Sequence, residues 1–199
     1  MRVILAIPAY ECEPQISRVL SKIPPALLAR LEAVWVLENR SVDATLRVAI
    51  ETARSLPDGK FEVFENTQNV GLGGSHKVAF QEARKRGATH VAVLHGDDQG
   101  EAEELLRLLN RAQATQGTVL GARFMLGSSL HGYSALRIAG NLLLNLAYSL
   151  FSGRVVYDLG SGVNLFRLSD VPEDRWPFYS NQFTFNMDLL LDLIRRKVP

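Results

Sequence analysis

Short apolar runs alternate along this chain with longer segments whose apolar residues recur at helical spacing. Each run precedes a polar loop, and the runs cover residues 3–7, 33–37, 61–64, 90–94 and 118–121. This alternation predicts an α/β fold, with a mostly parallel sheet flanked by helices on both faces. The 199 residues contain no low-complexity linker, so we expect a single domain over residues 1–199.

Composition excludes several classes of protein. A single cysteine, Cys12, excludes an internal disulfide and a zinc ribbon, and it is typical of the cytoplasm. A formal net charge of +1 gives no reason to expect a nucleic-acid partner. The longest apolar region, residues 139–151, is interrupted by Asn141 and Asn145 and is shorter than the roughly 20 residues of a membrane-spanning helix.

The last third of the chain departs from the alternation. Residues 134–152 predict one long helix that is apolar nearly all round, which indicates burial in the core, a protein partner or a membrane surface. Of these three we expect burial. Residues 155–166 are strand-like at both ends and have glycines between them, which is typical of a bulge or of close approach to a ligand.

Metal-binding and acidic side chains directly follow the apolar run at residues 90–94. The segment His95-Gly96-Asp97-Asp98-Gln99 would lie at the carboxyl edge of the sheet, where ligands of α/β proteins bind. Hard divalent cations commonly bridge a protein carboxylate to a substrate diphosphate, so we expect a metal-diphosphate site. The alternative is a polar turn in which Asp98 or Gln99 caps the helix that begins near Glu101.

Two other strand ends are also polar. The turn after the first strand, Pro8-Ala9-Tyr10, has no glycine, which argues against a dehydrogenase and against a nucleotidyltransferase. Pro8 and Tyr10 suit a wall against a flat base, although a turn proline and a partly buried tyrosine would look the same. Glu38 and Asn39 can bind a base edge or ribose hydroxyls after the second strand.

Glycines follow the third strand. Gly71, Gly73 and Gly74 permit close backbone approach at a helix N-terminus, where amides and the helix dipole favour an anion. Asp43, before an earlier helix, is expected to cap that helix.

Taken in order, these motifs resemble family 2 glycosyltransferases, and in particular the dolichyl-phosphate mannose synthase and polyprenyl-phosphate glycosyltransferase branch. The resemblance extends over nearly the whole chain. It rests on the following motifs: Ile7-Pro8-Ala9-Tyr10, Glu38 to Thr45, Asn69-Val70-Gly71-Leu72-Gly73-Gly74, His95 to Gln99, Gly121-Ala122-Arg123-Phe124, and the region that runs from Arg137-Ile138-Ala139-Gly140-Asn141 through to Asp158-Leu159-Gly160-Ser161-Gly162. It implies a nucleotide-sugar-binding fold of the GT-A type, a divalent cation on the diphosphate, and inverting transfer of a sugar.

The resemblance also implies roles for individual residues. Base and ribose contacts fall to Pro8, Tyr10, Glu38 and Asn39, and the donor site is completed by Glu11, Asn69, Gly71 and Lys77. Asp97 matches the second acidic residue of the metal motif, and Gln99 assists the metal. Arg123 and Arg137 would face the diphosphate or an acceptor phosphate. Asp158 would lie near the acceptor, as the general base if that acceptor is a hydroxyl.

Three positions depart from the family pattern. His95 stands where the first aspartate of the metal motif is expected, Cys12 replaces a glutamate, and Glu38-Asn39-Arg40 replaces aspartate-aspartate-glycine. Imidazole favours Mn²⁺ over Mg²⁺, so His95 is a third candidate metal ligand that would shift the preference toward Mn²⁺.

The function expected from this resemblance is metal-dependent transfer from a UDP- or GDP-sugar to a polyprenyl phosphate. Residues up to about 122 would bind the donor, and residues from about 123 would bind the acceptor. The alternatives are transfer to a soluble hydroxyl acceptor and non-catalytic binding of a nucleotide sugar. We expect a cytoplasmic protein at the cytoplasmic face of the membrane, with peripheral membrane contact or a homo-oligomer interface. The family's sequence continues beyond a segment such as Lys197-Val198-Pro199, so we also expect C-terminal truncation, with any membrane helices lost.

Overall fold

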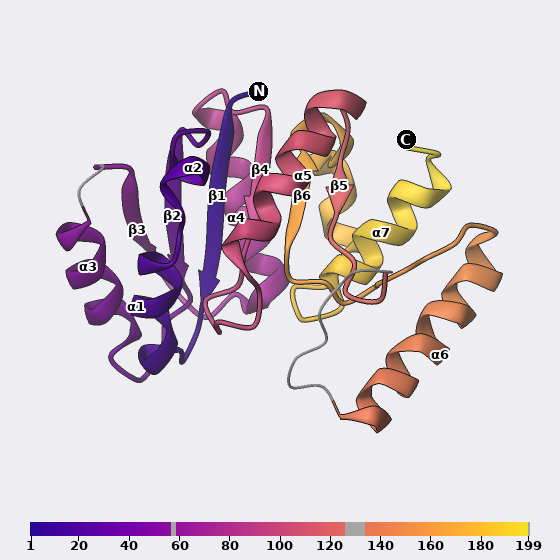
Figure 1. Cartoon of the computed structure of the whole chain (residues 1–199), viewed down its shortest axis with the longest axis horizontal. Helices are drawn as coiled ribbons and strands as arrows, with labels where there is room; N and C mark the ends of the chain where they lie inside the picture. Colours follow the sequence, from indigo (N-terminus) through magenta and orange to yellow (C-terminus); the bar gives the residue numbers. More distant parts are fainter. Residues whose placement is uncertain (57–58, 126–133, 199) are drawn as a thin grey trace.

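A six-stranded sheet forms the centre of the computed structural model, which describes residues 1–56, 59–125 and 134–198. The strand order is β3-β2-β1-β4-β6-β5 (Figure 1). The strands are β1 (Val3–Ala9), β2 (Ala33–Glu38), β3 (Phe61–Glu65), β4 (His90–Val93), β5 (Val119–Leu120) and β6 (Asn164–Arg167). The first four are parallel, and β6 runs antiparallel to both of its neighbours. The prediction of a mostly parallel α/β sheet is therefore confirmed.

Seven α-helices are found in the described ranges: α1 (Glu13–Ser21), α2 (Pro25–Leu28), α3 (Thr45–Ser55), α4 (Gly71–Lys85), α5 (Ala102–Thr115), α6 (Ala135–Ser152) and α7 (Phe185–Arg195). Asp43 lies one residue before the N-cap of α3, Ala44, and its carboxylate accepts a hydrogen bond from the Thr45 amide at 3.0 Å. Asp43 is therefore not the N-cap residue itself, but its carboxylate does bond the first amide of the helix, as a cap would.

The core consists of two apolar layers, one on each face of the sheet. Alternate β1 residues Leu5 and Ile7 face the layer with α1, α2 and α5, whereas Ile4 and Ala6 face the layer with α4 and α7. Because side chains of a strand alternate between its faces, β1 must be apolar throughout, and it is fully buried.

The parallel register places the site. Ala9 at the end of β1 pairs with Glu38 at the end of β2, which in turn pairs with Glu65 at the end of β3. The carboxyl ends of these strands therefore meet at one edge, together with the loop that follows β4.

Two expectations for the last third of the chain are wrong. Only the end of the 155–166 region is a strand, because Asn164 begins β6 whereas Val155 and Tyr157 lie in an exposed loop. Burial of the long helix is also wrong: Asn145 is the one residue of α6 classed as buried. Figure 1 shows α6 standing away from the sheet.

Polar residues attach α6 to the protein. The Asn145 amide donates to the Tyr157 carbonyl at 2.7 Å and accepts from the Leu159 amide at 3.2 Å, and Ser149 Oγ accepts from the Val156 amide at 2.9 Å. The leucines consequently face outward, with Leu143 68% and Leu150 76% exposed. The polar side of this helix faces the protein, the reverse of an ordinary surface helix.

Candidate functional site

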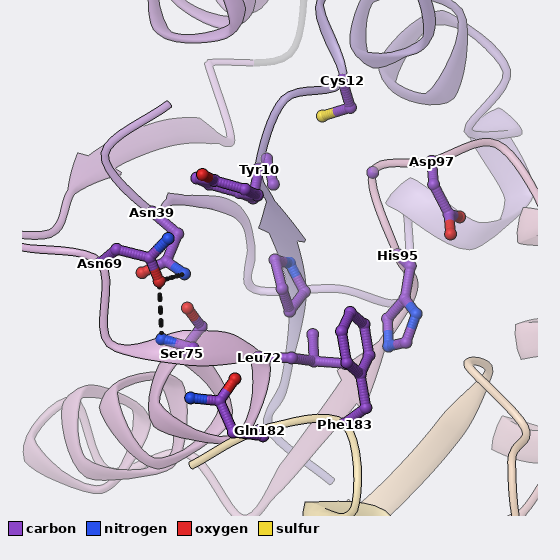
Figure 2. Close-up of a pocket in the computed structure, with 14 residues that line it drawn as sticks. Tyr10, Cys12, Asn39, Asn69, Leu72, Ser75, His95, Asp97, Gln182 and Phe183 are labelled. Atoms are coloured by element: carbon purple, nitrogen blue, oxygen red, sulfur yellow. Dashed lines mark hydrogen bonds between the residues drawn. The ribbon is translucent and has the colours of Figure 1, made fainter. Parts of the chain in front are cut away.

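A cleft of about 310 Å³ lies at the carboxyl edge of the sheet (Figure 2). Five segments contribute to it: the ends of β1 and β2, the start of α4, the loop after β4 and the loop before α7. Its lining residues are Pro8, Ala9, Tyr10, Cys12, Asn39, Asn69, Gly71, Leu72, Ser75, His95, Gly96, Asp97, Gln182 and Phe183. The structure thus brings together seven of the expected site residues, namely Pro8, Tyr10, Asn39, Asn69, Gly71, His95 and Asp97.

Tyr10, Asn39 and Asn69 occupy one end of the cleft (Figure 2). The Asn39 Oδ1 atom accepts from the Val70 amide at 2.9 Å and from Asn66 Nδ2 at 3.0 Å. Asn69 Oδ1 accepts from the Gly71 amide and from Asn39 Nδ2, both at 2.9 Å. Because backbone N–H groups can only donate, the orientation of both amides is fixed. Each oxygen already accepts two bonds, so the groups that these amides can still offer a ligand are N–H donors, although one N–H of Asn39 is already donated to Asn69.

Asp97 and His95 occupy the other end of the cleft (Figure 2). Asp97 is exposed, and its Oδ1 accepts from the Gln99 amide at 3.1 Å. Burial, with the positive charge of Arg123 as a second cause, lowers the pKa of His95 to about 4, so its imidazole is neutral at neutral pH. Within the described chain, His95 Nε2 has no hydrogen-bond partner. A neutral imidazole is the form of histidine that binds metals, but this unpartnered Nε2 atom is buried, so a cation in the cleft would not reach it without a movement of the ring.

The neighbouring carboxylate, Asp98, points elsewhere. Its backbone has φ of 59°, and its carboxylate bonds Arg18 at 3.1 Å and Lys22 at 3.1 Å, both from the region of α1. The described residues contain no group of three or more His, Cys, Asp or Glu side chains placed to bind a metal. Asp97 and His95 therefore suit a cation that a ligand diphosphate also coordinates, rather than a closed protein cage.

Cys12 lies in the cleft as a neutral group. Burial raises the pKa of its thiol to about 11, and its backbone amide donates to Thr45 Oγ1 at 2.9 Å.

Gly71, Gly73 and Gly74 have a different role from the expected anion site. A Cβ on Gly71 would lie 2.2 Å from the Asn181 carbonyl oxygen, and one on Gly73 would lie 2.5 Å from that of Ser180. The Gly74 amide donates to the Asn181 carbonyl at 3.2 Å. Gly71 and Gly73 admit the backbone before α7, so the close approach is present and its partner is the chain itself, while Gly71 also lines the cleft.

Lys77 takes part in the same contact. Its Nζ donates to the Tyr179 carbonyl at 2.7 Å and to Asn181 Oδ1 at 2.6 Å, outside the cleft. The expected role in donor binding is replaced here by attachment of the segment before α7.

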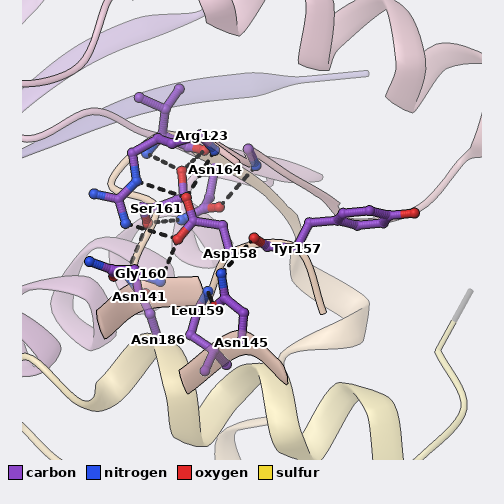
Figure 3. A network of polar contacts seen from close by, with 12 residues as sticks. Arg123, Asn141, Asn145, Tyr157, Asp158, Leu159, Gly160, Ser161, Asn164 and Asn186 are labelled. Carbon is purple, nitrogen blue, oxygen red and sulfur yellow. Dashed lines mark hydrogen bonds and ion pairs between the residues drawn. The ribbon is translucent and has the colours of Figure 1, made fainter. Parts of the chain in front are cut away.

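Arg123, which is partly exposed, forms an ion pair with the buried Asp158 (Figure 3). The guanidinium donates from Nε to Asp158 Oδ2 at 2.7 Å and from Nη2 to Oδ1 at 2.8 Å. Backbone amides of Arg123 and Gly160 add further bonds, each at 2.9 Å. Asp158 is thus fully engaged, and no side of its carboxylate is open to an acceptor hydroxyl.

Other expected site residues lie outside the cleft. Glu38 is 1% exposed, and its carboxylate accepts from the amides of Arg40 at 3.0 Å and Ser41 at 2.7 Å, so it holds the turn after β2. Glu11 is exposed. Arg137 is exposed in the first turn of α6.

Gln99 lies beyond His95, in a smaller cavity of about 180 Å³ that Arg123 also lines. His95 and Asp97 contribute to both cavities. The expected metal-site residues therefore lie between the larger cleft and the cavity that Arg123 lines.

Sequence reasoning missed Gln182 and Phe183. They are far along the chain from every strand-end motif, and no local pattern marks them.

Comparisons with known proteins agree with this architecture. The model of Glycosyl transferase family 2 matches residues 4–168. A polyprenol monophosphomannose synthase from Mycolicibacterium smegmatis is 23% identical over 189 residues, covering 94% of this chain and 70% of that protein.

Two solved structures have the same fold. Glucosyl-3-phosphoglycerate synthase from Mycobacterium tuberculosis, in complex with Mn²⁺, UDP and glucosyl-3-phosphoglycerate, matches with a TM-score of 0.70 and 16% identity, over 98% of this chain and 66% of that one. Mannosyltransferase PcManGT from Pyrobaculum calidifontis, in complex with GDP-Man and Mn²⁺, matches with a TM-score of 0.53 and 21% identity, over 61% and 35%. This chain spans only part of the length of each.

Proposed function

Because this chain belongs to glycosyltransferase family 2, we propose that it transfers a hexose from a nucleoside diphosphate sugar to a polyprenyl phosphate, with inversion at the anomeric carbon. The observation that carries the proposal is the cleft itself. It has a flat aromatic wall and two fixed amides at one end, and an available carboxylate beside a neutral imidazole at the other. A base, a ribose and a diphosphate require these groups in this order.

Asp97 is the proposed metal ligand, with His95 and Gln99 as supporting groups. A divalent cation held there with the diphosphate would neutralise charge on the leaving group. The Mn²⁺ complexes of the two structural neighbours support a cation in this fold.

A phosphate acceptor fits the Arg123–Asp158 pair better than a hydroxyl acceptor does. A phosphate is ionised near neutral pH, so its oxygen can attack the anomeric carbon without a general base, while the bond from that carbon to the diphosphate oxygen breaks. Asp158, which is buried against Arg123, then acts as a positioning residue. We assign the acceptor phosphate to Arg123, with Arg137 nearby in the sequence, and set aside the general-base role.

The outward leucines of α6 support a lipid acceptor. No helix in the described ranges has the length and hydropathy to cross a membrane. Because the leucines of α6 are exposed, we propose peripheral contact of α6 with a lipid surface at the cytoplasmic face. The name of the M. smegmatis relative agrees with a polyprenyl acceptor.

The test is Asp97→Asn measured beside its neighbour, Asp98→Asn. Asp97→Asn should abolish Mn²⁺-dependent binding of nucleotide sugar and transfer to a short-chain polyprenyl phosphate. Asp98→Asn should retain both, because its carboxylate bonds Arg18 and Lys22. Equal loss in the two variants would contradict the metal site, and binding without any transfer would indicate a non-catalytic nucleotide-sugar-binding protein.

A further inference from the structure

Residues 179–183, which we call the strap, cross the N-terminal turn of α4. The strap is held by the Gly74 amide and Lys77 on one side and by α7 on the other, where Asp188 Oδ2 accepts from the Ser180 amide at 2.8 Å. The close approach over Gly71 and Gly73 leaves no room for a side chain at either position. The strap is thus a fixed wall of the cleft, built from sequence remote from the strand-end motifs.

The strap ends in Phe183, whose side chain is unusual for a well-anchored segment. It is 81% exposed, although it lines the cleft. Its neighbour Phe185, two residues along, is 1% exposed in the core. An aromatic ring left in water at the rim of a cleft gains a favourable environment only when a ligand covers it.

The position of Phe183 indicates which part of a ligand would cover it. Figure 2 draws Phe183 at the His95 and Asp97 end, and Tyr10 with the two amides at the other. A donor with its base at Tyr10 and its diphosphate at Asp97 extends its sugar toward the Phe183 end. The apolar C–H face of a hexose is the part of such a ligand that packs on an aromatic face.

We propose that Phe183 is a platform for the sugar of the donor and so helps to determine which nucleotide sugar is bound. This rests on the proposed function, because it takes the orientation of the donor from the base and metal ends of the cleft. The platform contacts the sugar alone, so it contributes to binding of a nucleotide sugar and not to binding of the nucleotide without its sugar.

The experiment compares four ligands and three variants by calorimetric titration with Mn²⁺. The ligands are GDP-mannose and GDP, with UDP-glucose and UDP in parallel. Phe183→Ala should weaken binding of the nucleotide sugar about tenfold and leave binding of the nucleotide within about twofold. Phe183→Tyr should restore most of the loss. Phe178→Ala is the matched control, since Phe178 is 74% exposed but does not line the cleft, and it should resemble the parent.

The outcomes separate the platform from the proposed function. Equal weakening of nucleotide and nucleotide sugar by Phe183→Ala, or no weakening of either, would overturn the platform while the parent's binding still supports the glycosyltransferase assignment. A parent chain that binds none of the four ligands would contradict both.

Discussion

Asn39 and Asn69 present N–H groups to the cleft because their oxygens are bonded to backbone and side-chain donors of the protein. A wall of donors matches a base edge with adjacent acceptors, such as O6 and N7 of guanine. Uracil has its two acceptors, O2 and O4, on either side of an N–H group rather than side by side, so two adjacent donors match it less well, and an unmatched polar group has a cost when it is buried. We therefore expect GDP to bind more tightly than UDP.

The variant Asn69→Asp tests whether N–H donors set the preference for the base, with little change to the hydrogen bonds among Asn39, Asn69 and Gly71. One carboxylate oxygen can keep the bonds from Gly71 and Asn39, while the other replaces a donor with an acceptor. The GDP-to-UDP affinity ratio should fall at least about tenfold, equivalent to about 1.4 kcal/mol, in competition binding. Asn69→Ala, which removes both kinds of group, should lower affinity for each ligand without reversing the preference. An unchanged GDP-to-UDP affinity ratio in Asn69→Asp would contradict the hypothesis that the N–H donors of Asn39 and Asn69 select the base.

At the scale of a single element, α6 exposes its apolar side because Asn145 and Ser149 bind it to the loop at 156–159. Replacing Leu143, Leu146 and Leu150 with Ser should leave the fold intact, since these side chains are exposed and the helix-propensity cost is about 0.5 kcal/mol each. The same variant should lose co-sedimentation with vesicles that contain phosphatidylglycerol.

The matched control for α6 is Val42→Ser, which removes an 88% exposed apolar side chain from a different surface. Vesicle binding of this variant should equal that of the parent. A homo-oligomer that dissociates in the triple Ser variant, with no vesicle binding by the parent, would assign the leucines to a protein interface instead.

For the molecule as a whole, Asp192 links α7 to the preceding segment. Its carboxylate accepts from Tyr179 at 2.7 Å, Arg175 at 2.9 Å and Arg196 at 2.7 Å. Burial alone would raise the pKa of Asp192, but these three bonds outweigh it and hold the pKa below its ordinary value of 3.8. A lowered pKa in the folded state means that this stabilisation is present above pH 3.8 and is lost as the pH falls through the folded-state pKa.

Asp192→Asn should therefore lower the free energy of unfolding at pH 7 by about 1–3 kcal/mol, measured by urea denaturation. The difference from the parent should shrink as the pH is reduced below about 4. Asp174→Asn, at an exposed position, is the control and should change stability little. A difference that stays constant down to pH 3 would mean that the carboxylate charge is not responsible.

The central sheet, its parallel strands and the edge at which the cleft lies could be predicted from local sequence patterns. Strand and helix periodicities are local, so β1 and β4 could be recognised from a few neighbouring residues each. The edge at which their carboxyl ends meet follows from parallel topology, so Tyr10, Asn39 and Asp97 could be expected to lie together, and all three line the cleft.

Contacts between side chains that are far apart in the chain could not be predicted in this way, because they depend on how the elements pack. Lys77 bonds Asn181 in the strap, and Arg123 pairs with Asp158, which lies 35 residues further along the chain. The bond from Asn145 to the Tyr157 carbonyl turns the leucines of α6 outward. The local sequence pattern shows whether a residue is polar or apolar, but it does not show which distant residue that side chain will contact. A glycine beside a distant backbone and a glycine beside a phosphate therefore look the same in sequence, and the packing of remote segments distinguishes them.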